Sequence, residues 1–143
     1  MIWELPEPAA VEVKTEIVAP VPIEIKVENY MPISDPKNVR KFVEDYFVDI
    51  PILVKIAGCE SHFRHMNFKG RVIRGEQNEF DIGVMQINAL YHEDIAVKMG
   101  LNIYNIEDNV KYARYLYEKQ GVKPWVSSGA CWSKPLKSEI ARR

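Results

Sequence analysis

Apolar residues recur at helical spacing through most of the chain that follows Ser34. Such a period places their side chains on one face of a helix, from which they can pack into a core. Four stretches show it. The residues at helical spacing are Val39, Phe42, Val43 and Tyr46; Leu53, Ile56, Ala57 and Glu60; Ile87, Leu90, Ile95 and Met99; and Val110, Ala113, Leu116 and Tyr117. The pattern predicts a mainly α domain.

Residues that favour helix ends stand at the borders of these stretches. Ser34 or Asp35 can cap the first helix, with Pro36 in its first turn. The second helix is expected to open at Asp49 and Pro51 and to end near Ser61 or His62. The third should run from Asn88 to Met99, closed by Gly100. The fourth should run from about Ile106 to Gln120, with Asn105 and Asp108 as a capping box and Gly121 after the last turn.

One polar, glycine-bearing stretch interrupts the helical pattern. Between Asn67 and Asp81 the sequence FKGRVIRGEQNEFD contains Val72 and Ile73 as its only aliphatic pair. This composition is typical of a small β-hairpin or wing. The expected fold is therefore a helical domain with one short β-hairpin directly after the helix that carries Glu60.

The segment before Ser34 differs in composition from the rest. From Leu5 to Tyr30 it is rich in Pro, Val, Ile and Glu and contains no glycine. Proline disfavours a helix here, and the alternation in VEVK and IEIKVE favours extended backbone. We expect residues 1–33 to form a stiff linker or an edge segment, with disorder as the equal alternative. Residues 34–133 would then form the domain, and residues 134–143 a polar tail.

Composition bounds the class of protein. At 143 residues the chain suits one domain, and its 19 Lys and Arg nearly balance 20 Asp and Glu. No strong field therefore indicates a nucleic-acid partner. The chain contains no run of about 18 apolar residues and no signal-peptide pattern at its start. We expect a soluble chain that could be the exported part of a longer precursor.

Two cysteines, Cys59 and Cys131, lie far apart in the sequence. Their spacing fits neither a CxxC redox motif nor a four-ligand zinc site. They could form one long-range disulfide, which would stabilise the fold by about 4 kcal/mol in the chain-entropy treatment, or remain two buried thiols. A weaker alternative is a zinc site at Cys59, His62 and His65, for which no fourth ligand is evident nearby.

Glu60 occupies an inward-facing position on the same stripe as Leu53, Ile56 and Ala57. Loss of hydration penalises the charged form of a carboxyl and raises its pKa, which makes it a usable acid near neutral pH. A glycosidase needs such a group to protonate the departing glycosidic oxygen. The alternative is an acid at the edge of a helix end that reaches solvent or pairs with Arg64.

Four segments in order, KIAGCESHF, DIGVMQIN, IEDNVKYARYLYEKQG and PWVSSGACW, give the chain a resemblance to the soluble lytic transglycosylase domain of the lysozyme-like superfamily. The family shows a helix ending in Glu-Ser, a Gly-Leu-Met-Gln motif and an Asn-Ile-x-x-Gly-x-x-Tyr-Leu helix. The matching residues are Glu60-Ser61, Gly83-Val84-Met85-Gln86, and Asn109-Val110 followed by Ala113 and Leu116-Tyr117. The match covers roughly Asp49 to Trp132, which makes it fairly specific.

The resemblance implies a lysozyme-like α+β fold and a role for each matched residue. Glu60 would be the catalytic acid and base, and Ser61 would support its orientation. Gly83, Met85 and Gln86 would line the sugar cleft, where the Gln86 amide offers both donors and acceptors.

The last matched segment departs from the family pattern, which has an Ala-Tyr-Asn stretch whose tyrosine faces the acid. Here VSSGACW contains neither tyrosine nor asparagine. Trp125 or Trp132 could stack on a sugar instead, or Tyr112, Tyr115 or Tyr117 could come from the last helix; we select Tyr115 and Trp125. A Cys59–Cys131 bond would place VSSGACW beside Glu60.

A second acid would separate two enzyme classes. Hydrolysing glycosidases usually need a second carboxylate, whereas a lytic transglycosylase needs one, because the sugar's own hydroxyl closes an anhydro ring. Candidates are Glu76, Glu79 and Asp81, with Asp81 the strongest because it lies two residues before Gly83. The other interpretation of Asp81 is a turn-forming residue.

The resemblance therefore implies an exported, monomeric enzyme of the periplasm or outer cell envelope. It would cleave the β-1,4 bond between N-acetylmuramic acid and N-acetylglucosamine in peptidoglycan and form 1,6-anhydromuramyl products, without a cofactor or metal. Residues 1–33 could contact cell-envelope proteins. The alternatives are a lysozyme-type muramidase that uses Asp81, and a peptidoglycan-binding module without catalysis.

Overall fold

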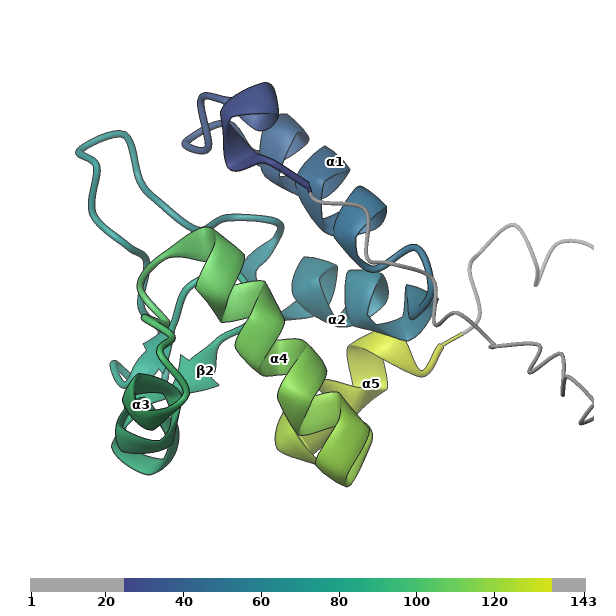
Figure 1. Ribbon diagram of the computed structural model, residues 1–143. Helices are drawn as coiled ribbons and strands as arrows, with labels where there is room; N and C mark the ends of the chain where they lie inside the picture. Colours follow the sequence, from purple (N-terminus) through teal and green to yellow (C-terminus); the bar gives the residue numbers. More distant parts are fainter. Residues whose placement is uncertain (1–24, 135–143) are drawn as a thin grey trace, which may run out of the picture.

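The computed structural model describes residues 25–134, which form a mainly helical domain with one small antiparallel sheet (Figure 1). This confirms the predicted helical class with a short β element. In chain order the elements are η1 (Val27–Tyr30), α1 (Pro36–Tyr46), α2 (Pro51–Ser61), β1 (Asp81–Ile82), β2 (Ile87–Asn88), α3 (Ala89–Lys98), α4 (Ile106–Gln120), η2 (Lys123–Ser128) and α5 (Gly129–Trp132). Within residues 25–134, no helix is long and apolar enough to cross a membrane.

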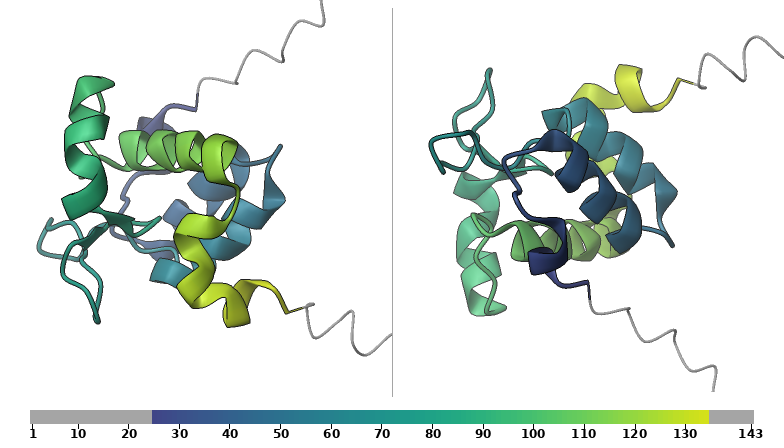
Figure 2. Two further views of the ribbon diagram at one scale, coloured as in Figure 1. Left: turned by 90° about the horizontal axis from the view of Figure 1, so that it is seen from below. Right: turned by 90° about the horizontal axis from the view of Figure 1, so that it is seen from above.

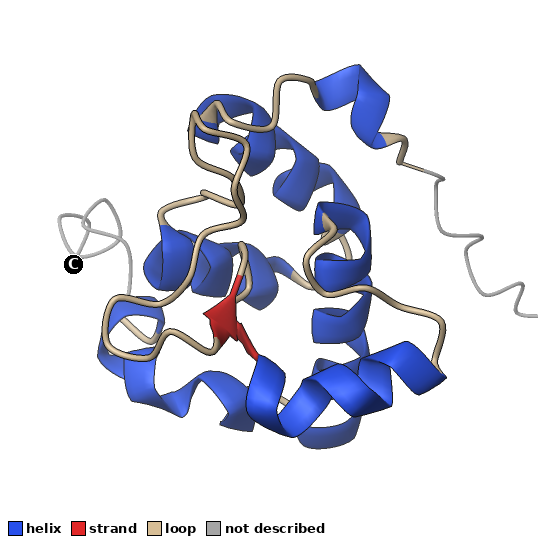
Figure 3. Cartoon of the chain, turned by 90° about the vertical axis from the view of Figure 1, so that its left-hand side faces the viewer, coloured by secondary structure: helices blue, strands red, loops and turns tan. Residues whose placement is uncertain are grey.

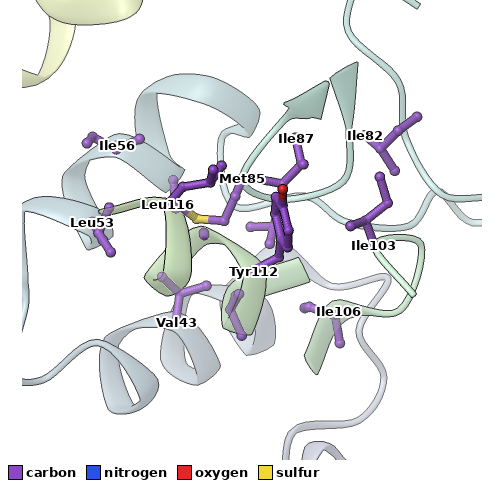
Figure 4. Packing of buried hydrophobic residues seen from close by; sticks show 14 of the residues in the cluster. Val43, Leu53, Ile56, Ile82, Met85, Ile87, Ile103, Ile106, Tyr112 and Leu116 are labelled. Atoms are coloured by element: carbon purple, nitrogen blue, oxygen red, sulfur yellow. The ribbon is translucent and has the colours of Figure 1, made fainter. Parts of the chain in front are cut away.

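Helices α1, α2 and α4 supply the apolar faces of the core. Val39, Phe42 and Val43 of α1 are buried, as are Leu53 and Ile56 of α2. Helix α4 lies across the other side of the core and brings in Tyr112 and Leu116, with Met85 between the layers (Figure 4). The α5 segment runs beside α2, so the end of the domain lies against the helix that carries Glu60 (Figures 1 and 2).

Three helices have side-chain caps at their N-termini. Asp35, Asn88 and Asn105 each accept a backbone N–H from the first turn, which confirms the Asp35 and Asn105 predictions. The capping box at Asp108 is wrong, because its carboxylate accepts the backbone N–H of Asn102 at 3.0 Å instead. The opening role of Asp49 is also wrong. Ile50 stands at the cap of α2, and Asp49 binds Arg114 through two hydrogen bonds of 2.7 and 3.0 Å.

The β-pairing lies later in the chain than the sequence predicted. Strands β1 and β2 pair with Asp81 opposite Asn88 and Ile82 opposite Ile87, so the matched GVMQ segment forms the hairpin turn. The predicted wing between Asn67 and Asp81 contains only isolated bridges, such as Met66 with Val72, and is mostly loop (Figure 3). The backbone hydrogen bonds of this segment go to several different loops rather than to one neighbouring strand, so no continuous β-ladder forms.

Helix α3 is helical as predicted, but three of the four apolar residues that define its period are exposed. Leu90 is 66% exposed, and Ile95 and Met99 are each 43% exposed. The helix instead rests on Ala89 and Ala96, both buried. These small side chains allow α3 to approach the domain closely, while its larger apolar side chains face outward. The apolar period alone cannot distinguish the packed face of the helix from its exposed face.

The segment from Ile25 to Ile33 packs on the domain rather than extending away from it. Val27–Tyr30 forms the 3-10 helix η1, where the sequence predicted extended backbone. The Tyr30 ring lies edge-on against Phe42 with centroids 5.4 Å apart, and its hydroxyl donates to Asp45 at 2.7 Å. This contact holds η1 on α1. The rest of the expected linker, residues 1–24, and nearly all of the expected tail, residues 135–143, lie outside the described residues.

Candidate active site

Glu60 lies in the last turn of α2, one residue before the helix ends. The helix stops because His62 adopts a left-handed conformation (φ 53°), followed by Phe63 in the same region (φ 59°). The preceding turns bury Leu53, Ile56 and Ala57, while the Glu60 side chain is half-buried. Helical periodicity therefore places this carboxyl at the edge of the core, where it keeps access to a surface cleft.

A disulfide joins Cys59 to Cys131, with the two Cα atoms 5.9 Å apart. This confirms the disulfide alternative of the sequence analysis. The bond ties the end of α2 to α5 and holds the segment before α5 beside Glu60. It also makes the zinc alternative wrong, because Cys59 is no longer a free ligand. Within residues 25–134, no three His, Cys, Asp or Glu side chains are grouped to hold a metal ion.

The Ser128 hydroxyl lies 2.7 Å from Glu60 Oε1. It also lies 3.0 Å from the backbone carbonyl of Trp125, and the Trp132 indole N–H donates to it at 3.1 Å. A serine hydroxyl has one proton and two lone pairs, so it can donate to an ionised Glu60 or accept from a protonated one while it donates to the Trp125 carbonyl. Ser128 can therefore bind either protonation state of the acid.

The surroundings of Glu60 raise the pKa of its carboxyl. Burial is the largest cause, because it disfavours the charged form, and the nearby negative charge of Asp81 acts in the same direction. The hydrogen bond from Ser128 opposes them by stabilising the carboxylate. The net shift is upward, which increases the fraction of protonated acid near neutral pH.

Glu60 stands where two lobes of one cleft meet. Both lobes are lined by Glu60, Asn78, Asp81, Gln86 and Ser127. The first, called here the neutral lobe, has a volume of about 280 Å³ and adds Asn88, Tyr91, His92 and Pro124. The second, called here the charged lobe, has a volume of about 460 Å³ and adds His62, Arg64, Arg74, Glu76 and Ser128. An extended ligand that fills both lobes would therefore contact Glu60.

Asp81 is the one candidate second acid that lines both lobes. It lies in β1 and accepts a hydrogen bond from the Asn88 amide at 3.2 Å across the hairpin. Burial raises the pKa of Asp81, and the Asn88 hydrogen bond partly offsets this rise. Glu76 lines the charged lobe only, and Glu79 is exposed and uses its backbone carbonyl to bind Arg74. Of the three candidates, only Asp81 lines both lobes together with Glu60.

The GVMQ turn is held by buried side chains from outside the hairpin. The Val84 N–H donates to His65 Nδ1 at 3.1 Å, and the Met85 N–H donates to Asn109 Oδ1 at 3.0 Å. The Asn109 amide returns two hydrogen bonds, to the carbonyls of Ile82 (3.0 Å) and Ile103 (2.8 Å). The backbone of the turn is thus fixed on α4 and on the loop after α2, which orients Gln86 into the cleft wall.

Gly83 has a positive φ (72°) and no room for a side chain. A Cβ atom there would lie 2.6–2.8 Å from His65 and Asn109. His65 itself is fully buried, its Nε2 lies 2.8 Å from the Tyr104 carbonyl, and burial lowers its pKa to about 4. With Nδ1 accepting from Val84, the neutral tautomer carries its proton on Nε2. Gly83 is not among the residues that line either lobe, and its close packing against His65 and Asn109 fixes the turn behind the cleft wall.

Gln86 is the residue of the matched motif that faces the cleft. It lines both lobes, and its side-chain amide donates to the Gly83 carbonyl at 2.9 Å. Met85 is fully buried in the core, so its predicted place in the cleft lining is wrong. Ser61 lines the charged lobe, but its hydroxyl donates to the Ala57 carbonyl at 3.0 Å. Ser128 makes the contact to Glu60 that Ser61 was expected to make.

The two aromatic candidates do not present a free ring face to the cleft. Trp125 forms part of the neutral lobe's wall but is only 2% exposed, and its indole N–H donates to the Met85 carbonyl at 2.9 Å. Tyr115 packs against Tyr112 and beneath Lys119, away from both lobes. The exposed aromatic ring in the lining is that of Tyr91, which is 74% exposed and lies outside the four segments that carry the family resemblance.

Comparison with known protein family models, curated proteins and solved structures finds no match to this chain.

Proposed function

We propose that this protein is a peptidoglycan lytic transglycosylase that uses Glu60 as its catalytic acid and base. The observation that carries the proposal is the position of Glu60, a half-buried carboxyl with a raised pKa at the junction of two cleft lobes. A glycan strand in both lobes would place a glycosidic oxygen near the carboxyl. The resemblance of the Glu-Ser, GVMQ and α4 segments to the transglycosylase family supports the same substrate class.

In the first step, protonated Glu60 donates its proton to the bridging oxygen between N-acetylmuramic acid and N-acetylglucosamine. The bond from that oxygen to the anomeric carbon breaks, and an oxocarbenium-like sugar forms. Glu60 is now a carboxylate. The Ser128 proton can turn from the Trp125 carbonyl to Glu60 Oε1 and stabilise the new charge, since both acceptors lie within 3.0 Å of its oxygen.

In the second step, the muramyl 6-hydroxyl attacks the anomeric carbon, and Glu60 takes the released proton. A 1,6-anhydro ring forms, and the acid returns to its starting state without a water molecule being consumed. One carboxyl suffices for both proton transfers, so this mechanism assigns Asp81 an electrostatic role. Its negative charge raises the pKa of Glu60 and disfavours loss of the proton before substrate binds.

A second candidate function is a muramidase that hydrolyses the same bond. It is favoured by one observation, the presence of Asp81 in the walls of both lobes with Glu60. In that mechanism Asp81 would act as the nucleophile or activate a water, and Glu60 would still protonate the leaving oxygen. The products would carry a reducing end instead of an anhydro ring.

We further propose that the protein works in an exported compartment, the periplasm or the outer cell envelope. The Cys59–Cys131 disulfide supports this, because such bonds persist in oxidising environments.

Digestion of purified peptidoglycan followed by mass spectrometry tests the function. Muropeptides lighter by one water than lysozyme products are expected. Products with reducing ends alone would favour the muramidase, and glycan that stays intact with protein bound would favour a binding module.

Glu60→Gln keeps the shape of the acid and removes proton transfer, so we expect a loss of at least about 100-fold in rate. A loss of only a few-fold would reject Glu60 as the acid.

A further inference from the structure

Two arginines line the charged lobe without being committed to a carboxylate. Arg64 donates through Nε to the Ser61 carbonyl at 3.3 Å, and Arg74 donates through Nη1 to the Glu79 carbonyl at 3.1 Å. The Arg74 guanidinium also lies over the Tyr104 ring, 5.9 Å from its centroid. Each side chain is thus anchored by neutral groups, and most of its N–H donors remain available.

The ion pairs of residues 25–134 lie elsewhere. They join Arg40 to Glu44, Lys41 to Asp45 and Arg114 to Asp49. The charged lobe also contains Glu76, Asp81 and Glu60, but none of these carboxyls is within ion-pair distance of Arg64 or Arg74. A planar guanidinium matches a carboxylate through two parallel hydrogen bonds. The two arginines therefore offer a place for an acidic group of a ligand.

The neutral lobe offers a different surface. Its own residues include Asn88, Tyr91 and His92 but no Lys or Arg. The cleft consequently has one end suited to uncharged hydroxyl and acetamido groups and one end suited to a carboxylate, with Glu60 between them.

Resting on the proposed function, we propose that the charged lobe holds the muramic acid side of the scissile bond and binds a carboxylate carried by that sugar through Arg64 and Arg74. The carboxylate belongs either to the lactyl ether of a bare glycan or to the peptide attached there. This fixes the direction in which the strand lies, with N-acetylglucosamine in the neutral lobe.

Binding to the Glu60→Gln protein tests this without depending on cleavage. Three hexasaccharides serve as ligands: a chitin fragment without carboxylates, a peptide-free glycan with lactyl carboxylates, and the same glycan with its peptides. We expect at least one carboxylate-bearing ligand to bind roughly fivefold or more tightly than the chitin fragment by calorimetry. A gain already present with the peptide-free glycan identifies the lactyl group, and a gain only with peptides identifies the peptide.

Arg64→Gln with Arg74→Gln, made together in the Glu60→Gln protein, should remove that preference, so that the ratio of the affinities for the carboxylate-bearing ligand and for the chitin fragment falls to about one. Arg71→Gln is the matched control, because Arg71 is an exposed arginine of the same loop outside both lobes. Equal binding of all three ligands, or a preference that survives the double substitution, would overturn the proposal. A digest that releases no product would reject the proposed enzyme activity but would leave this binding result readable.

Discussion

Ser128 and Glu60, 68 residues apart in the sequence, are joined by a hydrogen bond of 2.7 Å between the serine hydroxyl and the carboxyl. The Cys59–Cys131 disulfide connects the same two segments, with each cysteine within three residues of the hydrogen-bonded pair. The covalent bond and the hydrogen bond therefore form one unit that positions the acid.

Ser128→Ala should lower the turnover number by about tenfold, because one hydrogen bond to the charged acid is lost. Since Ser128 lowers the pKa of Glu60, its removal should raise that pKa further. The alkaline limb of the kcat/KM profile would then move to higher pH, because the acid stays protonated over a wider range. Ser128→Thr, which retains the hydroxyl, should restore most of the rate and the wild-type limb. An unchanged profile in the alanine variant would show that Ser128 has only a structural role.

Asp81→Asn separates the two proposed reactions. In a transglycosylase the rate should change by a few-fold, and the anhydro product should persist. The pKa of Glu60 should fall, because a neighbouring negative charge that raised it is gone, so the alkaline limb moves to lower pH. A muramidase would lose at least about 100-fold in rate when its second carboxylate is removed. Product masses and the pH profile of the same variant distinguish these outcomes.

Removal of the disulfide should affect both stability and activity. Replacing Cys59 and Cys131 by alanine opens a covalent loop with a sequence separation of 72 residues. In the chain-entropy treatment this lowers the free energy of unfolding by about 4 kcal/mol, measurable as a shift of the urea midpoint. The rate should fall as well, since Ser128 loses its tether to α2. Reductant should shift the wild type in the same direction and leave the double variant unchanged; a reductant-insensitive wild type would contradict the role of the bond.

The residues that the sequence predicted well were those whose role depends on local pattern. Apolar period and capping residues located the four main helices, and the same period placed Glu60 on the inner stripe of α2. The sequence also supplied the disulfide as one of two alternatives. Residues whose role depends on distant contacts were missed: nothing in VSSGACW distinguishes Ser128 from Ser127 as the partner of Glu60.

The wrong predictions have a similar physical basis. Met85 is a large apolar residue in a segment that does approach the cleft, but it turns into the core. Trp125 does form part of the neutral lobe's wall, but its ring is almost fully buried and its indole N–H donates to the Met85 carbonyl. Ser61 lies next to Glu60 in sequence, yet successive helix positions face different directions, and its hydroxyl bonds back to Ala57. Tertiary packing decided each of these cases, and a single sequence carries no information on which partner is chosen.

His65 predicts a pH dependence of stability, because burial lowers its pKa to about 4 from an ordinary value of 6.5. Above pH 6.5 the histidine is neutral in both the folded and the unfolded chain, so its contribution is fully present. As the pH falls from about 6.5 to about 4, the unfolded chain binds the proton first, and the free energy of unfolding decreases by roughly 3 kcal/mol in total. Below pH 4 this loss is complete.

Glu60 and Asp81 act with the opposite sign, because their raised pKa values favour the folded state as they become protonated. The Glu60→Gln and Asp81→Asn double variant removes that opposing contribution and should show the larger acid-side loss in urea titrations. The pKa of His65 itself can be read from the NMR shift of its ring Cε1 proton. A value near 6.5 in the folded protein would contradict the buried, neutral histidine that holds the Val84 N–H and, through it, the turn that presents Gln86 to the cleft.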